Sequence, residues 1–224
     1  MVTLHHLEYS QSFRILWLLE ELGVDYELKL YRRDPQTKLA PADYKAVSPL
    51  GTAPVITDGE FALAETAAIF DYLLDRYPSE TLRPAPGSPG RDRYLFWFHA
   101  AQGSVMPLML MDGVFHILQA RVPSLFNLVL TPVLNKATDG FIRPRMVRLL
   151  ALAEEDLAAQ EWFGGSALSG ADILLSYPIE SASRRGYLTG GHPNTRVWLE
   201  CIRARPAFRK AQEMDGHESM VLPL

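Results

Sequence analysis

The sequence predicts an α/β domain at its N-terminal end, followed by an all-helical domain. Residues 2–31 read as strand, helix and strand, and residues 54–77 read as strand, tight turn, strand and helix. Beyond residue 90 the apolar residues recur at helical spacing. The stretch between, PSETLRPAPGSPG, has the proline and glycine content of a linker. We therefore expect domains at residues 1–77 and 91–224, joined by a linker at residues 78–90.

The first domain begins with an alternating stretch, Val2–Leu7, which fits a half-buried strand. A helix follows, with Ile15 and Leu18 on one face, and Gly23 stands where a C-terminal helix glycine is expected. The alternating residues Tyr26–Tyr31 predict a second strand. A strand–helix–strand unit of this length implies that the two strands pair in parallel.

The second half of this domain is a hairpin followed by a helix. Two apolar runs, Pro54–Ile56 and Phe61–Leu63, flank a turn with an Asp-Gly pair at 58–59, and glycine supplies the positive φ of a tight hairpin. Helical spacing begins near Glu65, and a weak helix is expected around residues 41–45. The resulting βαβ-ββα order predicts a thioredoxin-like fold.

Two features of this half predict a ligand dock. Pro54 is a candidate cis proline, and a cis bond would turn the main-chain N–H and C=O of Ala53 outward to pair with an extended ligand. Glu65 and Thr66 open a helix, whose N-terminus attracts a carboxylate, and Glu65 adds an acid for an ammonium group. A trans proline starting an edge strand and an ordinary helix cap are the alternatives. Together, the features predict a peptide-like ligand.

The second domain reads as a series of helices. The first runs from about residue 91 past residue 119, and Pro107 is expected to kink or break it. Residues 122–135 are expected to form a short buried helix or a lip over the site. Ser169 and Asp172 fit a capping box, which implies a structural role for this carboxylate. Further helices are expected at residues 143–160, 195–204 and 206–214.

Composition excludes several classes of protein. The net charge of −4 with mixed signs argues against a nucleic-acid partner. One cysteine, Cys201, excludes an internal disulfide and a cysteine-based metal cluster, and the histidine spacing predicts no metal site. No apolar run is long enough to span a bilayer, so we expect no membrane partner and a cytoplasmic protein.

The loop after the first strand is the most promising place for chemistry. Ligands of such sheets bind at the carboxyl ends of the parallel strands, where Ser10 and Ser12 lie. A helix N-cap is the alternative role for both serines, and we consider it the better interpretation of Ser12. Disulfide chemistry is not expected, because this loop has serines in place of cysteine.

These segments resemble the cytosolic glutathione S-transferases. Ala53-Pro54-Val55-Ile56, Ala64-Glu65-Thr66-Ala67 and the Ser10–Arg14 segment are similar to the glutathione-binding half of bacterial, serine-type members with a theta-like or delta-like first domain. The resemblance covers nearly the whole chain, and it is loose between residues 100 and 165. It implies an enzyme that binds glutathione as co-substrate without a metal.

The resemblance also implies roles for particular residues. Ser10 would donate a hydrogen bond to the glutathione sulfur and favour the thiolate, the form that attacks electrophiles, with Tyr9 as its rival. Ala53 and Pro54 would hold the tripeptide main chain, and Glu65 with Thr66 its γ-glutamyl end. Candidates for further contacts are Ser12, Thr52, which stands where many relatives carry lysine, and Lys38 for the glycine carboxylate, with Arg32 or Arg33 as alternatives.

A hydrophobic electrophile is expected between the two domains, where pockets commonly form. The candidate walls are Gln102, Met106, Leu110 and Phe115, with Tyr9 opposite them. The family resemblance further implies a homodimer and a role in detoxification. Two alternatives stay open from the sequence. One is another glutathione-dependent reaction, by an isomerase, a dehalogenase or a peroxidase, and the other is a non-catalytic binding protein.

Overall fold

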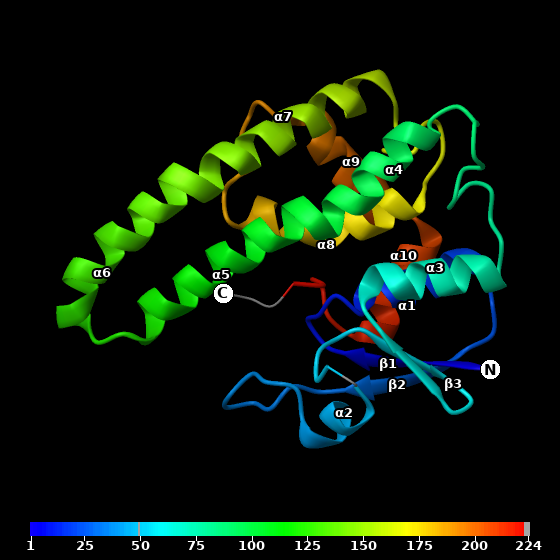
Figure 1. Cartoon of the computed structure of the whole chain (residues 1–224), viewed down its shortest axis with the longest axis horizontal. Coiled ribbons are helices and arrows are strands. Elements are labelled where there is room, and N and C mark those ends of the chain that lie inside the picture. The colour runs from blue at the N-terminus through cyan, green and yellow to red at the C-terminus, as the bar shows by residue number, and fades with distance from the viewer. Residues whose placement is uncertain (49, 222–224) are drawn as a thin grey trace.

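The computed structural model describes residues 1–48 and 50–221, and it has a small sheet at one end of a larger group of helices (Figure 1). The strand order is β2-β1-β3-β4, with β1 parallel to β2 and antiparallel to β3. β3 and β4 form the predicted hairpin around Gly59, whose φ is +62°. The strands are β1 Val2–Leu7, β2 Glu27–Tyr31, β3 Val55–Asp58 and β4 Phe61–Ala64.

Three helices complete the predicted βαβ-ββα order and confirm the thioredoxin-like fold. Helices α1 and α3 lie on the side of the sheet that faces the helical part of the chain, while α2 lies below the strands in the view of Figure 1. The C-terminal end of α1 is capped by Gly23, whose φ of +63° suits glycine. The bounds are α1 Phe13–Leu22, α2 Ala42–Val47 and α3 Thr66–Arg76.

The helical part begins with α4 (Arg91–Ala100), which continues through a π-helical segment, η1 (Ala101–Val105), into α5 (Met106–Arg121). Pro107 has no N–H to donate to the carbonyl one turn before it, and its ring crowds that carbonyl. The π segment directly before α5 accommodates this, so Pro107 stands in the first turn of α5 and the predicted interruption is a local widening.

Helix α8 is the central helix of this part: it packs against α4, η1, α5 and α1, and its residues from Gly170 to Ala182 are all buried. The predicted capping box is present at its start, where Asp172 accepts hydrogen bonds from the N–H and the hydroxyl of Ser169 at 2.8 and 2.7 Å. The bounds are α6 Ser124–Ala137, η2 Thr138–Ile142, α7 Arg143–Ala159, α8 Gly170–Arg184, α9 Pro193–Ala204 and α10 Pro206–Asp215.

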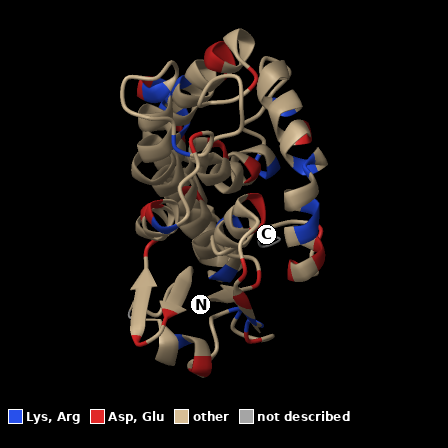
Figure 2. Ribbon diagram, turned by 90° about the vertical axis from the view of Figure 1, so that its right-hand side faces the viewer, with Lys and Arg blue, Asp and Glu red and all other residues tan. Residues whose placement is uncertain are grey.

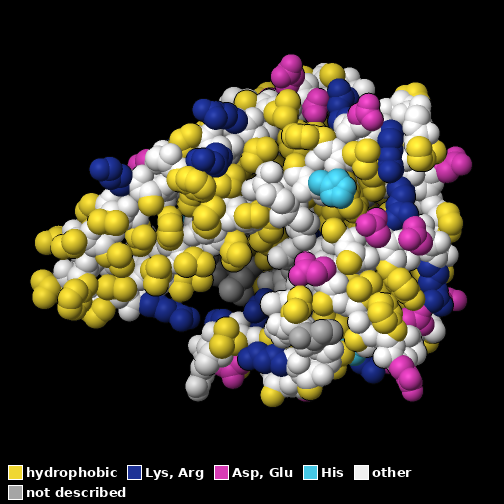
Figure 3. All heavy atoms as spheres, viewed as in Figure 1, with side chains coloured by type: hydrophobic (Ala, Val, Ile, Leu, Met, Phe, Trp, Pro, Cys, Tyr) yellow, Lys and Arg dark blue, Asp and Glu magenta, His cyan; other side chains and the backbone are white. Residues whose placement is uncertain are grey.

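The expectation that residues 122–135 form a short buried helix or a lip over the site is wrong. They form most of α6, which lies at the far end of the molecule from the sheet (Figure 1). Its side chains are among the most exposed apolar groups, with Leu125 80% and Leu128 79% accessible. Apolar side chains gather at this end of the molecule in the space-filling view (Figure 3).

One hydrophobic core runs through both parts of the chain. The last helix, α10, returns to pack on α1, where the ring of Phe208 meets Phe13 and Trp17 edge-on, at 5.2 Å from each ring. This return brings the C-terminal end of α10 close to the end of β1. Acidic and basic residues are intermingled over the described part of the chain (Figure 2). Within that part, no helix is both long enough and apolar enough to cross a bilayer.

Candidate active site

The loop between β1 and α1 places Ser10 at the carboxyl ends of the parallel strands. Its side chain is only 5% exposed, and its Oγ lies 2.7 Å from the main-chain oxygen of Leu7 and 2.7 Å from Ser12 Oγ. The Ser10 hydroxyl is therefore bonded within the protein, although it also lines a cleft. A ligand atom in that cleft would compete with Leu7 for its hydrogen.

A cleft of about 320 Å³ lies between the start of α3 and the start of α5, and the predicted dock residues meet there. The Ala53–Pro54 bond is cis, as predicted, and both residues line the cleft. Its full lining is Gln11, Thr52, Ala53, Pro54, Glu65, Thr66, Gln102, Met106, Pro107 and Leu110. A volume of this size is at the lower end of the range for small-molecule sites.

Glu65 has an unusual main chain for a residue with a side chain. Its φ is +73° and its ψ is 118°, and it is the residue directly before α3. A non-glycine residue at positive φ costs on the order of 1–3 kcal/mol, and such positions cluster at ligand sites. In this conformation the exposed Glu65 lies at the rim of the cleft, while Thr66 is buried beside it.

A second cleft, of about 280 Å³, adjoins the first and shares Gln11, Thr52 and Ala53 with it. Two cationic residues, Arg33 and Lys45, line this second cleft together with Ser10 and Tyr177. Burial lowers the pKa of Arg33, whose Nε and Nη2 donate to the main-chain oxygens of Glu8 and Tyr9 at 3.0 and 3.2 Å. The joined clefts thus have an acid at one end and two basic residues at the other.

Arg14 is fully buried beneath the first cleft, and its hydrogen-bond partners are neutral groups. Its guanidinium donates to the main-chain oxygen of Leu174 at 2.6 Å and to the side-chain oxygens of Gln102 and Thr66 at 3.3 and 3.5 Å. It also contacts Gln11 Oε1. Burial lowers the pKa of Arg14 to about 9, which leaves it charged at neutral pH. Arg14 therefore brings a positive charge to the floor of the cleft.

Some predicted contact residues lie elsewhere. The Tyr9 ring stacks on His217 at 4.1 Å and its hydroxyl meets His217 Nδ1 at 2.8 Å, so it is directed away from both clefts. Lys38 is exposed and lines neither cleft. Ser12 precedes α1, but its buried hydroxyl makes no cap and bonds to His6 Nδ1 at 2.8 Å.

The predicted hydrophobic wall is only partly assembled at the cleft. Gln102, from the π segment, and Met106 and Leu110, from α5, line the first cleft above Thr66. Phe115 does not line it, because it lies farther along α5 and packs against the core.

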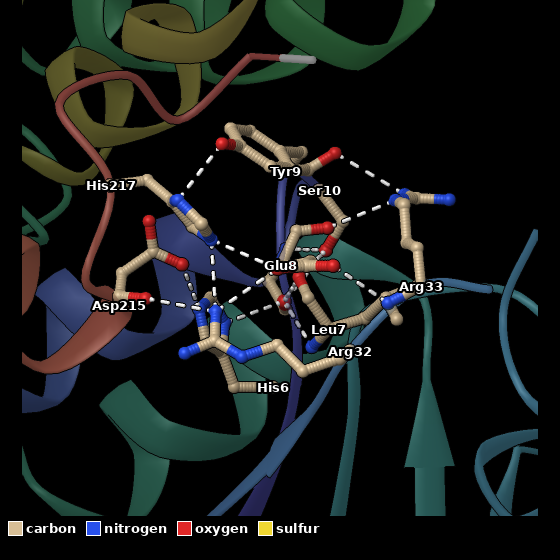
Figure 4. A network of polar contacts seen from close by, with 10 residues as sticks. His6, Leu7, Glu8, Tyr9, Ser10, Arg32, Arg33, Asp215 and His217 are labelled. Atoms are coloured by element: carbon tan, nitrogen blue, oxygen red, sulfur yellow. Dashed lines mark hydrogen bonds and ion pairs between the residues drawn. The ribbon is translucent and has the colours of Figure 1, made fainter. Parts of the chain in front are cut away.

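A network of polar side chains behind Ser10 was not predicted from the sequence. His6 bonds to Ser12 in the Ser10 loop and to Asp215 at the end of α10. His217, which follows α10, bonds to Tyr9 of the same loop, as Figure 4 shows. A histidine on a buried strand two residues from a polar loop was the available signal. Its partner, Asp215, lies more than two hundred positions along the chain, so no local pattern could pair the two residues. Across the described residues, no group of acidic, histidine and cysteine side chains could hold a metal ion.

Comparisons with known proteins place this geometry in context. Residues 10–76 match the family model of the glutathione S-transferase N-terminal domain. A glutathione S-transferase of Schizosaccharomyces pombe is 31% identical over 99% of this chain and 91% of its own length. One from Saccharomyces cerevisiae is 24% identical over 95% of this chain and 94% of its own.

Solved structures show the same fold. A glutathione S-transferase from Actinobacillus pleuropneumoniae superposes with a TM-score of 0.78 and 33% identity, over 96% of this chain and 93% of its own. A family member from Pseudomonas fluorescens, solved with two glutathione molecules bound, has a TM-score of 0.73 and 23% identity, over 95% of this chain and 92% of its own.

Proposed function

Because the chain belongs to the glutathione S-transferase family, we propose that it activates the thiol of glutathione for attack on a hydrophobic electrophile. The observation that carries the proposal is the charge arrangement of the joined clefts. Glu65 at one end suits the ammonium group of the γ-glutamyl moiety, and Arg33 with Lys45 at the other end suits the glycine carboxylate. Ala53, which lines both clefts, is then the place for the middle of the tripeptide.

In this pose the γ-glutamyl carboxylate lies at the start of α3. Thr66 supplies a hydroxyl there, and the first turn of the helix adds its main-chain N–H groups and partial positive charge. Thr52 and Gln11 flank the main chain of the ligand. Arg33 and Lys45 take the role that the sequence suggested for Lys38, because they line the cleft and Lys38 does not.

Ser10 is the proposed donor to the sulfur. Its hydroxyl lines the second cleft beside Ala53, and a shift of its hydrogen from the Leu7 oxygen to the ligand would bring a donor to the sulfur. A free thiol has a pKa of about 8.5, and a hydrogen bond to the thiolate is worth about 1.5–3 kcal/mol, which lowers that pKa by roughly one to two units. The hydrophobic electrophile would lie against Met106 and Leu110, close to the ligand.

The test is Ser10→Ala, with the exposed Ser166→Ala as matched control. We expect turnover of an activated aryl halide to fall about 10- to 100-fold, the pKa of bound glutathione to rise by one to two units, and the affinity for S-methylglutathione to change less than threefold. Ser166→Ala should leave all of these values unchanged. Unaltered turnover in Ser10→Ala would remove Ser10 from the mechanism, and a wild-type protein that binds no glutathione would remove the function itself.

The proposal includes a homodimer and a cytoplasmic location, where glutathione is kept reduced. The dimer is supported by the apolar arm, which we define as the exposed apolar side chains of α6 together with Ile117 of α5 (Figure 3). A contiguous apolar surface of this kind on a soluble protein commonly marks an interaction site. The arm consists of Ile117, Leu125, Phe126, Leu128, Val129 and Val133, each at least 46% exposed.

A further inference from the structure

A chain of short polar contacts runs from the end of α10 to the cleft at Ser10 (Figure 4). Asp215 Oδ1 lies 2.6 Å from His6 Nε2, and His6 Nδ1 lies 2.8 Å from Ser12 Oγ. Ser12 Oγ lies 2.7 Å from Ser10 Oγ, which lies 2.7 Å from the main-chain oxygen of Leu7. Asp215, His6, Ser12 and Ser10 are all buried, and Ser10 alone of these four lines the cleft.

Each of these four contacts is short enough to need a hydrogen between its two atoms. The two serine hydroxyls supply one hydrogen each, and a neutral imidazole beside an ionised Asp215 supplies one more. These three hydrogens leave one of the four contacts without a hydrogen, so that the lone pairs of its two atoms would face each other. A further proton on the His6–Asp215 pair gives every contact its hydrogen, whether that proton lies on the imidazole or on the carboxyl group.

The same assignment satisfies the main-chain groups around the serines. Ser12 Oγ then accepts from His6 Nδ1–H and from the N–H of Leu7 at 3.1 Å, and it donates to Ser10. Ser10 Oγ accepts from the hydroxyl of Ser12 and from its N–H at 3.2 Å, and it donates to Leu7. Each hydroxyl accepts two hydrogen bonds and donates one, which is its full capacity. Ser12 Oγ also lies 3.1 Å from the main-chain oxygen of Leu7, and this longer contact receives no hydrogen because Ser10 donates to Leu7 at 2.7 Å.

The charges around the pair also call for a compensating proton. Asp215 Oδ2 is buried without a hydrogen-bond partner, and an ionised carboxyl group in that state is costly unless a proton or cation balances it. Arg32 is a cation that contacts Asp215, but at 3.5 Å from its main-chain oxygen and not at the carboxyl group. Arg32 pairs with Glu8 at 3.0 Å, and Glu8 also meets His217 at 2.9 Å. On α1, Arg14 is directed at Leu174.

We propose that the His6–Asp215 pair holds one shared proton, and that this proton makes Ser10 a hydrogen-bond donor toward the cleft. The inference rests on the proposed function, in which Ser10 meets the glutathione sulfur. With the proton present, Ser12 donates to Ser10, so Ser10 can give its hydrogen only to Leu7 or to a ligand. Without it, the hydrogen of Ser12 turns toward His6, and Ser12 Oγ becomes a second acceptor inside the protein that competes with a ligand for the hydrogen of Ser10. His6, Ser12 and Asp215 are therefore positioning residues.

The direct test is the ¹⁵N NMR signal of the His6 ring in the wild-type protein at neutral pH, assigned by its loss in His6→Asn. We expect Nδ1 to carry a hydrogen. A bare, pyridine-like Nδ1 would overturn the proposal. This measurement requires no activity and no folded variant other than the one used for assignment, which His6→Gln can replace.

Two substitutions at Asp215 test the consequence for the thiol. In Asp215→Leu the pair loses its acceptor, and we expect the pKa of bound glutathione to rise by about one unit, a tenfold loss of thiolate at a pH below that pKa. In Asp215→Asn the amide can donate to Nε2 and hold the hydrogen at Nδ1, so the rise should be less than half as large. S-methylglutathione, which has no thiol proton, should bind both variants within threefold of the wild type.

The outcomes separate this inference from the function on which it rests. A thiol pKa in Asp215→Leu equal to that of the wild type, with S-methylglutathione bound normally, would overturn the role of the pair and leave glutathione activation by Ser10 intact. Equal rises in the Leu and Asn variants would also count against it, because they would reflect a general disturbance. A wild-type protein that does not lower the pKa of glutathione would overturn the proposed function as well.

Discussion

The guanidinium of Arg14 donates to the main-chain oxygen of Leu174 at 2.6 Å and so joins α1 of the α/β domain to α8 of the helical domain. The same group reaches Gln11, Gln102 and Thr66, each of which lines the first cleft. The guanidinium carbon of Arg14 also lies over the Tyr177 ring, 5.5 Å from the ring centre. One buried cation therefore fixes both the floor of the cleft and the contact between α1 and α8.

Replacing this cation should weaken ligand binding more than it weakens the fold. In Arg14→Met, Gln11, Gln102 and Thr66 lose their common donor, so we expect the Kd for glutathione to rise at least tenfold by calorimetry. The thermal midpoint should change by only a few degrees, because the hydrogen bonds lost are offset by relief from burying a charge.

Arg93→Met is the control for Arg14→Met, since Arg93 pairs with Asp156 at 3.2 Å and lines neither cleft. It should leave glutathione affinity unchanged. An Arg14→Met protein with wild-type affinity would show that the charge is structural alone.

Thr66→Val removes one hydroxyl and keeps the shape of the side chain. If this hydroxyl donates to the γ-glutamyl carboxylate, a charge-assisted hydrogen bond of about 1.5–3 kcal/mol is lost, and the KM for glutathione should rise 10- to 100-fold. The kcat at saturating glutathione should stay within threefold, because the contact lies away from the sulfur. Steady-state kinetics decide this, with Thr131→Val on α6 as the control. A fall in kcat at constant KM would contradict the assigned role.

Local signals were sufficient to predict much of the fold and part of the site. The Asp-Gly turn, the Ala53–Pro54 bond and the capping box at Ser169 each depend on neighbouring residues, and all are present. The strand–helix–strand order of residues 2–31 likewise predicted a parallel strand pair, because a short crossover leaves few other arrangements. The expectation that Val2–Leu7 is half-buried is wrong, since all six residues of this strand are buried.

What the sequence could not predict depends on contacts between distant segments. Arg33 was named from the sequence only as an alternative to Lys38, because no local pattern indicates that its guanidinium is held by the main-chain oxygens of Glu8, Tyr9 and Lys38. Lys45, which lines the same cleft, was not named at all. Helix α6 was misjudged for a different reason. Its apolar composition suggested burial, although apolar residues also contribute much of the surface of folded proteins.

The pH dependence of stability should reveal a cap at the start of α9. Glu154 accepts hydrogen bonds from the N–H of Asn194 at 2.7 Å and of Thr195 at 2.9 Å. Burial alone would raise the pKa of the Glu154 carboxyl group, but these hydrogen bonds outweigh it and lower the pKa below its ordinary 4.5. The stabilisation is then fully present above the unfolded-state pKa and is lost as the pH falls through the lower, folded-state value.

Glu154→Gln should therefore cost about 1 kcal/mol of unfolding free energy at pH 7, the usual value of such a cap at a solvated site. The difference from the wild type should shrink as the pH is lowered from 5 to 3 in urea titrations. Glu155→Gln, at the exposed neighbouring position, is the control and should show no such trend. A difference that is constant with pH would mean that the charge of Glu154 is not involved.

The apolar arm predicts the assembly state. Burying its side chains against a second copy would remove apolar surface from water at about 25 cal/mol per Å², so we expect the wild type to have twice the 25.2 kDa chain mass by light scattering at micromolar concentration. Leu128→Asp places a charge in the middle of the arm and should yield a monomer with an unchanged circular dichroism spectrum. Val197→Asp adds the same charge at an exposed apolar position on α9 and should stay dimeric. A wild-type monomer, or a Leu128→Asp dimer as stable as the wild type, would exclude the arm as the dimer interface.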